Sequence, residues 1–284
     1  MRTLDEMLSG AARVRVTTVG APGDDLLDLT DPAELELLRE ALAVGRATGG
    51  YCMCLGDLTF TFLDGGDRRI VDVGFHHGVA LRWPGCDGDA PLLDGGRVLR
   101  WLARHGVDGP LAQEGQRQAV RQRERLAEEH WKAAAPAAVR DLLDLAIAAA
   151  HTTGVLPPSV PALVATRLAE AVPDRAERAA ALLTWYGSGT GRYSGFPVHE
   201  SLPAPALAAT PIADLIDALQ RFPGDVRVAA GAVRHLCGWR SRTHLTRDIA
   251  RLPAEVRARL LAVARESDDD TTRRRAEQYL ATRP

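Results

Sequence analysis

The strongest constraint on the fold is the segment LTFTFLDGGDRRIVDVGF, residues 58–75, in which two stretches rich in aromatic and β-branched residues flank the sequence DGGD at 64–67. Short stretches of this kind, joined by Asp and Gly, are typical of a β-hairpin. The sequence YCMCLGD lies just before the hairpin at 51–57, and His76-His77 follows it. Folding of the hairpin therefore brings thiols and imidazoles close together.

The length of the connection predicts how the two strands pair. We expect strands near 51–63 and 68–83, with residues 64–67 between them, and this connection places Phe60 opposite Val71. Side chains alternate between the two faces of a strand, so that a slip by one residue would move every side chain to the other face. The pairing thus predicts which side chains share the apolar face.

In the same pairing, Cys54 lies opposite His77. Cys52, Cys54 and His77 then share the apolar face, and His76 points to the opposite face. Directly opposed Cβ atoms are about 4.5–5.5 Å apart, so these three side chains can converge on one ion or on one another. A bulge at Gly56 or a longer turn would exchange the roles of the two histidines.

A metal site is the first interpretation of this cluster. Two thiolates and an imidazole suit zinc, copper or iron, and three protein ligands with one open position are the pattern of a catalytic zinc site. The candidate metal ligands are Cys52, Cys54 and His77, with His76 beside them. The C-x-C spacing matches no standard zinc finger. A fourth ligand could come from Cys86, His105, Asp57 or His76.

Two other interpretations use the same residues. Cys54 could be a nucleophilic thiolate with His77 as its base, because a neighbouring imidazole lowers the pKa of a thiol. Asp57 or Asp72 would then have to orient the histidine. Alternatively, the thiols are structural, since free cysteine is among the most buried residue types. A metal site accounts for the hairpin slightly better than either.

Composition limits the classes of function. The chain has 284 residues, of which 46% are apolar and 25% charged, as in a soluble globular protein. Its formal net charge of −2 offers no overall attraction to nucleic acid or to an anionic membrane. The first residues do not resemble a secretory signal, and no apolar run reaches the roughly 18 residues of a membrane helix. We expect a cytoplasmic protein with reduced cysteines, whose partner is a small molecule or a protein.

The first domain, residues 1–110, is expected to be α+β. Residues 12–19 alternate like a strand, whereas 32–44 and 94–105 have helical spacing. Asp31 is a suitable N-cap for the first of these helices. Together with the hairpin, this order predicts a small α+β layer in which helices cover a sheet.

The second domain, residues 111–284, has helical patterns throughout. Its first helix, near 114–134, is highly charged, but glutamates offset the arginines and argue against nucleic-acid binding. Prolines separate the later amphipathic segments, which fit an all-α bundle or an array of helix pairs of the HEAT type. These further helices are expected near 137–151, 160–172, 175–186, 211–221, 225–237, 254–266 and 270–281.

One segment of the second domain, WYGSGTGRYSGFP at 185–197, is too rich in glycine for a helix. Glycines let backbone amides approach a phosphate or a peptide, and aromatic rings can stack on a ligand. The segment lacks the Lys-Ser/Thr ending of a P-loop. It is either a binding loop or an ordered loop that packs its aromatic residues against the first domain. The candidate binding residues are Trp185, Tyr186, Arg192, Tyr193 and Phe196.

Two functional hypotheses of different classes follow. In the first, the chain is a metal-binding protein or metal-dependent enzyme whose cysteine-histidine cluster holds one zinc, copper or iron ion that activates water, oxygen or a substrate group. In the second, the chain is a non-catalytic protein-binding, immunity or regulatory protein. The cluster is then structural, and the helical domain supplies the interaction surface.

Overall fold

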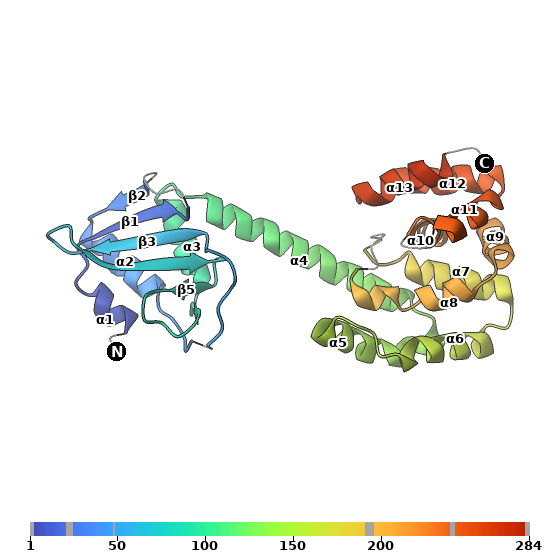
Figure 1. Ribbon diagram of the computed structural model, residues 1–284, viewed down its shortest axis with the longest axis horizontal. Helices are drawn as coiled ribbons and strands as arrows, with labels where there is room; N and C mark the ends of the chain where they lie inside the picture. The colour runs from blue at the N-terminus through green and yellow to red at the C-terminus, as the bar shows by residue number, and fades with distance from the viewer. Residues whose placement is uncertain (1–2, 21–24, 48, 191–195, 239–241, 282–284) are drawn as a thin grey trace. The chain divides into compact units, whose positions relative to one another are not determined.

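The chain folds into two compact units, Met1–Arg121 and Gln122–Pro284, each with its own hydrophobic core. The boundary between them falls inside helix α4 (Gly109–Ala134). An antiparallel sheet in the first unit and helices in the second confirm the predicted fold class (Figure 1). The computed structural model describes residues 3–20, 25–47, 49–190, 196–238 and 242–281.

The first unit is built on a six-stranded antiparallel sheet with the strand order β2-β1-β3-β4-β5-β6. The hairpin expected from the sequence forms its β3 and β4 strands. The strands are β1 (Arg13–Thr18), β2 (Asp25–Leu29), β3 (Leu58–Leu63), β4 (Arg69–His76), β5 (Ala80–Arg82) and β6 (Ala90–Pro91). The helices that precede α4 are α1 (Leu4–Leu8), α2 (Pro32–Ala41) and α3 (Gly95–Arg104).

Helices α2 and α3 bury their apolar sides against one face of the sheet. Phe60 on β3 and Val73 and Phe75 on β4 are fully buried on that face, together with Trp101 of α3. The Asp31 carboxylate accepts hydrogen bonds from the first-turn amides of α2, which confirms the predicted N-cap. Because successive side chains of a strand point to opposite faces, every second residue of β4 points away from this core, and that outer face can hold polar side chains.

The predicted pairing of β3 with β4 is wrong by two residues. Phe60 pairs with Val73 instead of Val71, because the register shifts after Phe62 and the connection is one residue longer than expected. The Asp64 carboxylate stabilises this longer turn by accepting hydrogen bonds from two backbone amides within it. A slip of two residues leaves every side chain on its predicted face, so the apolar face of the hairpin is as expected.

The predicted start of β3 and the predicted end of β4 are also wrong. Strand β3 begins only at Leu58, and residues 51–57 form a loop. Strand β4 ends at His76, where the chain reverses through His77 and Gly78, with φ of 53° and 75°, into β5. Positive φ at both central residues is the signature of a tight hairpin turn. Consequently the predicted ladder pair of Cys54 with His77 does not form.

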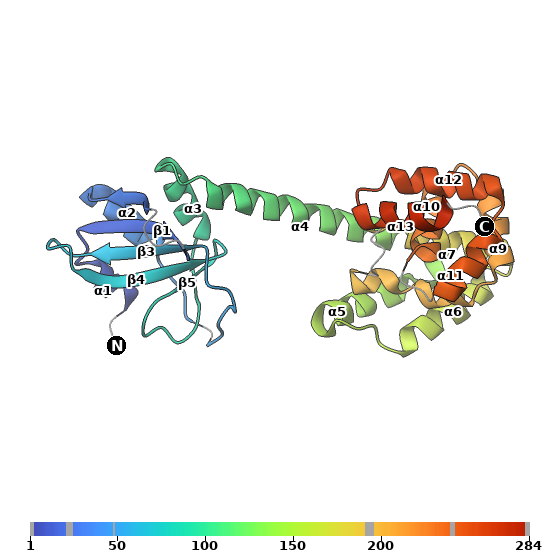
Figure 2. The same cartoon turned by 45° about the horizontal axis from the view of Figure 1, so that its top comes forward.

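The second unit is helical (Figure 2), and each helix expected from proline spacing is present within a few residues. Its core includes Trp131 and Trp185, whose ring centroids lie 5.1 Å apart. Three short elements, η2, α8 and α11, were not expected. After α4 the elements are η1 (Ala137–Leu142), α5 (Leu143–Thr153), α6 (Ser159–Ala171), α7 (Arg175–Tyr186), η2 (Val198–Ser201), α8 (Ala204–Ala209), α9 (Ile212–Arg221), α10 (Val226–Leu236), α11 (Arg242–Ala250), α12 (Ala254–Arg265) and α13 (Asp270–Leu280).

Within the described ranges, no single helix has both the length and the apolar character needed to cross a membrane. Only a pair bent by 111°, Val198–Ala209 with Ile212–Arg221, meets those criteria when its two parts are taken together.

Candidate metal centre

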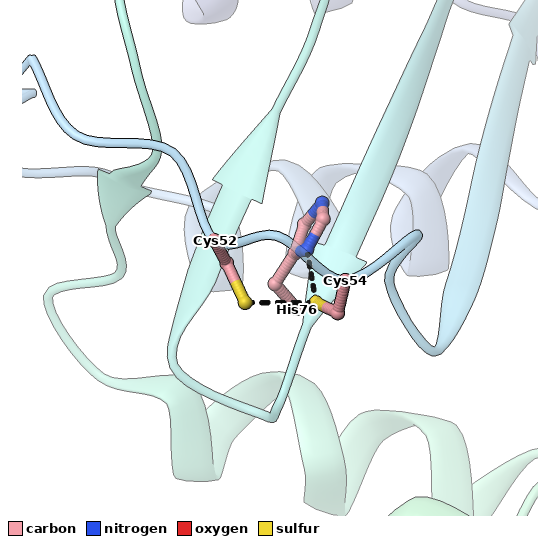
Figure 3. Close-up of side chains that lie close together, drawn as sticks. All are labelled: Cys52, Cys54 and His76. Atoms are coloured by element: carbon pink, nitrogen blue, oxygen red, sulfur yellow. Dashed lines mark hydrogen bonds between the residues drawn. The ribbon is translucent and has the colours of Figure 1, made fainter.

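The loop before β3 and the end of β4 bring two thiols and a histidine together (Figure 3). The sulfur atoms of Cys52 and Cys54 are 3.0 Å apart, and the Cys54 sulfur lies 3.3 Å from Nδ1 of His76. The ligand atoms of these three residues all lie within 4.8 Å of one another. This cluster has the dimensions of a metal-binding group.

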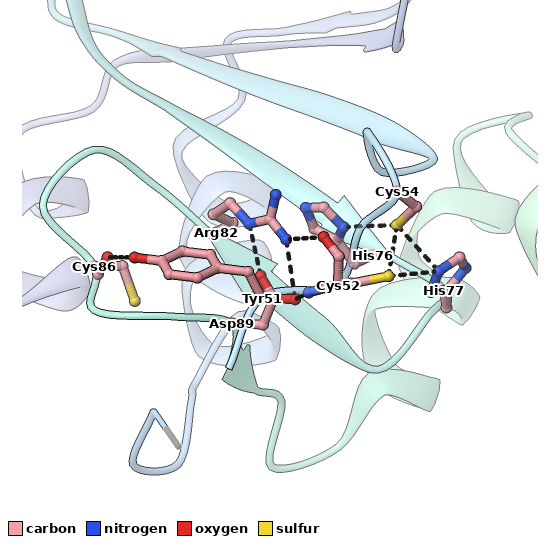
Figure 4. A network of polar contacts seen from close by, with 8 residues as sticks. All are labelled: Tyr51, Cys52, Cys54, His76, His77, Arg82, Cys86 and Asp89. Atoms are coloured by element: carbon pink, nitrogen blue, oxygen red, sulfur yellow. Dashed lines mark hydrogen bonds and ion pairs between the residues drawn. The ribbon is translucent and has the colours of Figure 1, made fainter. Parts of the chain in front are cut away.

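His77 approaches the same thiols from the turn between β4 and β5 (Figure 4). Its Nε2 atom lies 3.4 Å from the sulfur of Cys52 and 3.1 Å from that of Cys54. Both histidines of the pair therefore contact the thiols. The C-x-C and H-H motifs, which lie more than twenty residues apart in sequence, supply a set of two sulfur and two nitrogen donors.

The predicted pairing placed His76 on the face opposite the cysteines, as one of four possible fourth ligands, whereas in the structure its ring contacts Cys54 directly. His76 does lie on the face of β4 opposite the core, as predicted. The error concerned the cysteines, because a loop, unlike a strand, does not fix which face its side chains take. Residues 51–57 cross the outer face of the sheet and place Cys54 against the ring of His76.

Two glycines make room for the imidazole of His76, which is only 2% exposed. A Cβ atom at Gly56 would lie 3.3 Å from the ring, and one at Gly74 would lie 3.2 Å from its Nε2. Burial, followed by the nearby charge of Arg82, lowers the pKa of His76 below its ordinary value. The ring is therefore neutral at pH 7, which is the form that binds a metal.

The backbone of His77 is held by the aspartate at the end of the same loop. The carboxylate of Asp57 accepts a hydrogen bond of 2.6 Å from the His77 amide, and its other oxygen lies 3.8 Å from Nδ1 of the ring. A carboxylate on the Nδ1 side favours the tautomer that leaves Nε2 free to bind a metal. The side chain of His77 is 47% exposed, so it is the most accessible member of the cluster.

The ion pair of Arg82 with Asp89 holds the backbone of the loop at Cys52 in place (Figure 4). The carboxylate of Asp89 accepts hydrogen bonds of 2.6 Å from the Cys52 amide and from Nε of Arg82. Arg82 also donates to the Cys52 carbonyl at 2.8 Å and lies over the ring of Tyr51. Charge-assisted hydrogen bonds of this kind hold the backbone that carries the first thiol.

Sequence reasoning missed Asp89 and Arg82. Arg82 pairs with Gly74 on the neighbouring strand, so it shares the outer face of the sheet with His76. This placement follows only once β5 is known to be a separate strand. Asp89 lies in the connection to β6, where nothing in the sequence sets its orientation.

The two thiols differ in acidity. A hydrogen bond from the Cys54 side chain, aided by the Cys54 amide and by His77, lowers the pKa of Cys52 to about 7. The same contact raises the pKa of Cys54, since its proton is shared with a thiolate acceptor. Cys52 is thus the more ionised thiol, whereas the nucleophile hypothesis named Cys54.

The other proposed fourth ligands lie outside the group of ligand atoms. His105 packs on Trp101, with Nε2 3.1 Å from a carboxylate oxygen of Glu34, and so links α3 to α2. Burial raises the pKa of the Cys86 thiol. Asp57 positions the backbone of His77, as described above. Of the four candidates named from the sequence, only His76 contributes a ligand atom to the group.

The segment 185–197, predicted as a binding loop, begins in the structure as the end of a helix. Trp185 and Tyr186 form the last turn of α7 and are buried in the core, so they are not loop residues. Phe196 is 60% exposed. Arg192 and Tyr193 lie outside the described residues. Helix α7 continues to Tyr186 and ends at the first glycine, Gly187, so both aromatic residues belong to the helix and pack into the core.

Comparisons with protein-family models, with curated proteins and with solved structures yield no match. The function therefore has to be inferred from the chemistry of the cluster.

Proposed function

We propose that the first unit binds one transition-metal ion, with zinc the best match, through Cys52, Cys54, His76 and His77. The observation that supports this is the convergence of two thiols and two imidazoles from two separate segments, in which each imidazole lies within contact distance of at least one thiol. A set of two sulfur and two nitrogen donors is typical of tetrahedral zinc, whereas copper(I) and iron also accept thiolates.

The distances between the donors support a tetrahedral ion. With Zn–S of about 2.3 Å and Zn–N of about 2.0–2.1 Å, tetrahedral S and N ligands lie roughly 3.5 Å apart and two S ligands roughly 3.8 Å apart. The three S–N contacts of Cys52 with His77, Cys54 with His76 and Cys54 with His77 are 3.1–3.4 Å long, and the S–S distance is 3.0 Å. The sulfur atoms of the two half-buried cysteines would have to move slightly apart to match the S–S distance of a tetrahedral site.

The surroundings of the donors also fit a metal centre. Two thiolates this close repel one another, and a divalent cation offsets that repulsion. Asp57 and Asp89 hold the backbone of the ligating segments through their amides. Such outer contacts, which orient ligands before the ion arrives, are a regular feature of metal sites.

His77 determines what the ion can do. Four protein ligands leave no open position, and such a centre stabilises the fold by fixing the loop to the sheet. Since His77 lies on an exposed turn, it is the ligand that water or a substrate group would replace. The resulting centre with three protein ligands and one water is the kind that activates water or a substrate group in metal-dependent enzymes.

Metal analysis of the full chain, purified without chelators or a nickel column, tests the proposal. We expect near-stoichiometric zinc in this cluster, lost in Cys54→Ser and in His76→Ala. Cys86→Ser is the matched control, because Cys86 is another half-buried free cysteine of the same unit and lies outside the group. Unchanged metal content in both ligand variants would refute the proposal. Retention in His77→Ala would identify a centre with an exchangeable fourth position.

A further inference from the structure

The helical unit contains a second group of metal-ligand side chains, made of Glu128 on α4, His151 on α5 and His199 on η2. Their ligand atoms all lie within 4.8 Å of one another. One oxygen of Glu128, Oε2, lies 3.6 Å from Nε2 of His151 and 3.9 Å from Nε2 of His199. These separations are too long for hydrogen bonds, so the three groups face a common point without bonding one another.

His199 is the most informative member of this group. It is 1% exposed, and neither of its ring nitrogens has a hydrogen-bond partner among the described residues. A buried polar group without a partner costs free energy, and native proteins rarely leave one. Its ring packs edge-on against Trp131, with centroids 5.2 Å apart, and faces His151 at 5.7 Å. The ring is therefore held by packing with its nitrogens unbonded.

The two oxygens of Glu128 have separate environments. Oε1 lies 3.3 Å from the ammonium of Lys132, one turn along the same helix. Oε2 is the atom that faces both histidines. The lysine thus orients the carboxylate, and it leaves one oxygen available to a cation.

We propose that Glu128, His151 and His199 bind a divalent transition-metal ion, zinc or iron(II), independently of the cysteine cluster. Two histidines with one carboxylate are the ligand set of many hydrolytic zinc sites and of non-haem iron sites. A tetrahedral zinc ion places N and O ligands roughly 3.4 Å apart. The observed 3.6 Å and 3.9 Å need only a slight contraction.

A bridging water fits this geometry less well. A water that makes two hydrogen bonds of about 2.8 Å at a tetrahedral angle separates its partners by roughly 4.6 Å. The separations of 3.6 Å and 3.9 Å between Glu128 and the two histidines are both shorter than that. These short distances between the carboxylate oxygen and the two ring nitrogens favour a metal ion, whose bonds to nitrogen and oxygen are about 2.0–2.2 Å.

The site opens on a cavity of about 420 Å³ that Glu128, His151 and His199 line together with Phe196 and Arg125. Three protein ligands leave coordination positions for water or a ligand, and these positions face the cavity. The cavity is large enough for a small molecule. The second site therefore has the open character of a catalytic or ligand-binding ion, in contrast with the four donors of the first unit.

The test uses the full chain with Cys52→Ser and Cys54→Ser, which removes the first cluster, and measures binding of cobalt(II) and zinc. We expect this double variant to retain one ion per chain, with a cobalt spectrum that lacks the near-ultraviolet band of thiolate ligands. Adding Glu128→Gln or His151→Ala should remove that ion. His130→Ala is the matched control, since His130 is an exposed histidine on the same helix.

The variants are chosen so that failure to fold cannot explain a loss of metal. His151 is 60% exposed, and Glu128→Gln preserves the shape of the side chain, so both variants should keep the helical circular dichroism of the parent. Absence of cobalt and zinc from the Cys52→Ser, Cys54→Ser chain would overturn the proposal. Equal binding by the Glu128→Gln and His151→Ala chains would overturn it as well. Neither result bears on the cysteine cluster, which is measured separately.

Discussion

Replacement of Asp89 by asparagine tests whether the fold prepares the cysteine cluster for a metal. The carboxylate accepts hydrogen bonds of 2.6 Å from the Cys52 amide and 2.6 Å and 3.1 Å from Arg82. Asparagine keeps the size of the side chain but removes its charge. The Cys52 amide and the guanidinium then compete for one neutral oxygen.

The expected effect follows from these contacts. A hydrogen bond to a charged group contributes about 1.5–3 kcal/mol, and the Asp89 side chain is only 14% exposed, so solvent weakens it little. Each tenfold change in affinity corresponds to about 1.4 kcal/mol. Loss of one such bond should therefore weaken zinc binding by about 10- to 100-fold, the range found when groups behind metal ligands are changed.

Competition with a chromophoric chelator measures the zinc dissociation constant of the Asp89→Asn chain. Asp87→Asn serves as the control, because Asp87 lies two residues away and is exposed. The control should bind zinc like the wild-type chain. Equal zinc affinity of the Asp89→Asn and wild-type chains would show that the contacts of Asp89 with Cys52 and Arg82 do not prepare the cysteine cluster for a metal. A matching loss in Asp87→Asn would point to a general charge effect instead.

Three further predictions concern thiol reactivity and stability. In mass-spectrometric alkylation with iodoacetamide, bound zinc should protect Cys52, and Cys237 should react only on unfolding, because burial raises its pKa to about 12. Gly56→Ala should lower the free energy of unfolding by about 1–3 kcal/mol in chemical denaturation, since φ is 93° there and a Cβ atom would meet the His76 ring. Arg234→Met should cost about 3–5 kcal/mol by the same assay, because it leaves the fully buried carboxylate of Glu200 without its cation.

Each of these predictions has a control and a contrary outcome. Equal alkylation of Cys52 with and without zinc would argue against its role as a ligand. Gly50→Ala lies in the same loop, and a Cβ atom there meets nothing within 4 Å, so it should leave stability nearly unchanged. Addition of Glu200→Gln to Arg234→Met should recover part of the lost stability, and a further loss would contradict the ion-pair argument.

Local patterns predicted most of the fold. Asp31 was identified as an N-cap because its side chain can bond only the amides next to it, and helix ends of this kind are determined within a few residues of sequence. The apolar face of the hairpin survived an error in register, because the pairing slipped by two residues, which is one full period of a strand. Features set by short-range geometry were therefore predictable.

The arrangement of the cysteine cluster was less predictable, because it depends on a loop. No periodicity governs residues 51–57, so the face reached by Cys54 is set by Gly56, with its φ of 93°, and by the distant Arg82 and Asp89. The positive φ of His77 was equally hidden, since histidine gives only a weak signal for a turn. The hairpin pattern in the sequence predicted that the two motifs meet, whereas tertiary contacts determine how their side chains are oriented.

The second group was missed because its members are far apart in sequence. Glu128, His151 and His199 lie on three separate elements, more than twenty residues apart in sequence. The exposed face of α4 gave no sign that one glutamate had a distinct role. The cue was a buried histidine without hydrogen bonds, which only coordinates can reveal.

The two groups differ in chemistry, and this difference predicts how they respond to the same reagents. Thiolates in the first unit are soft donors that oxidation or alkylation removes, whereas the imidazoles and carboxylate of the second unit react much more slowly with mild oxidants and alkylating reagents. The groups belong to units with separate hydrophobic cores. Mild oxidation of the zinc-loaded chain should therefore release metal from the cysteine cluster alone and leave the ion at Glu128, His151 and His199 in place.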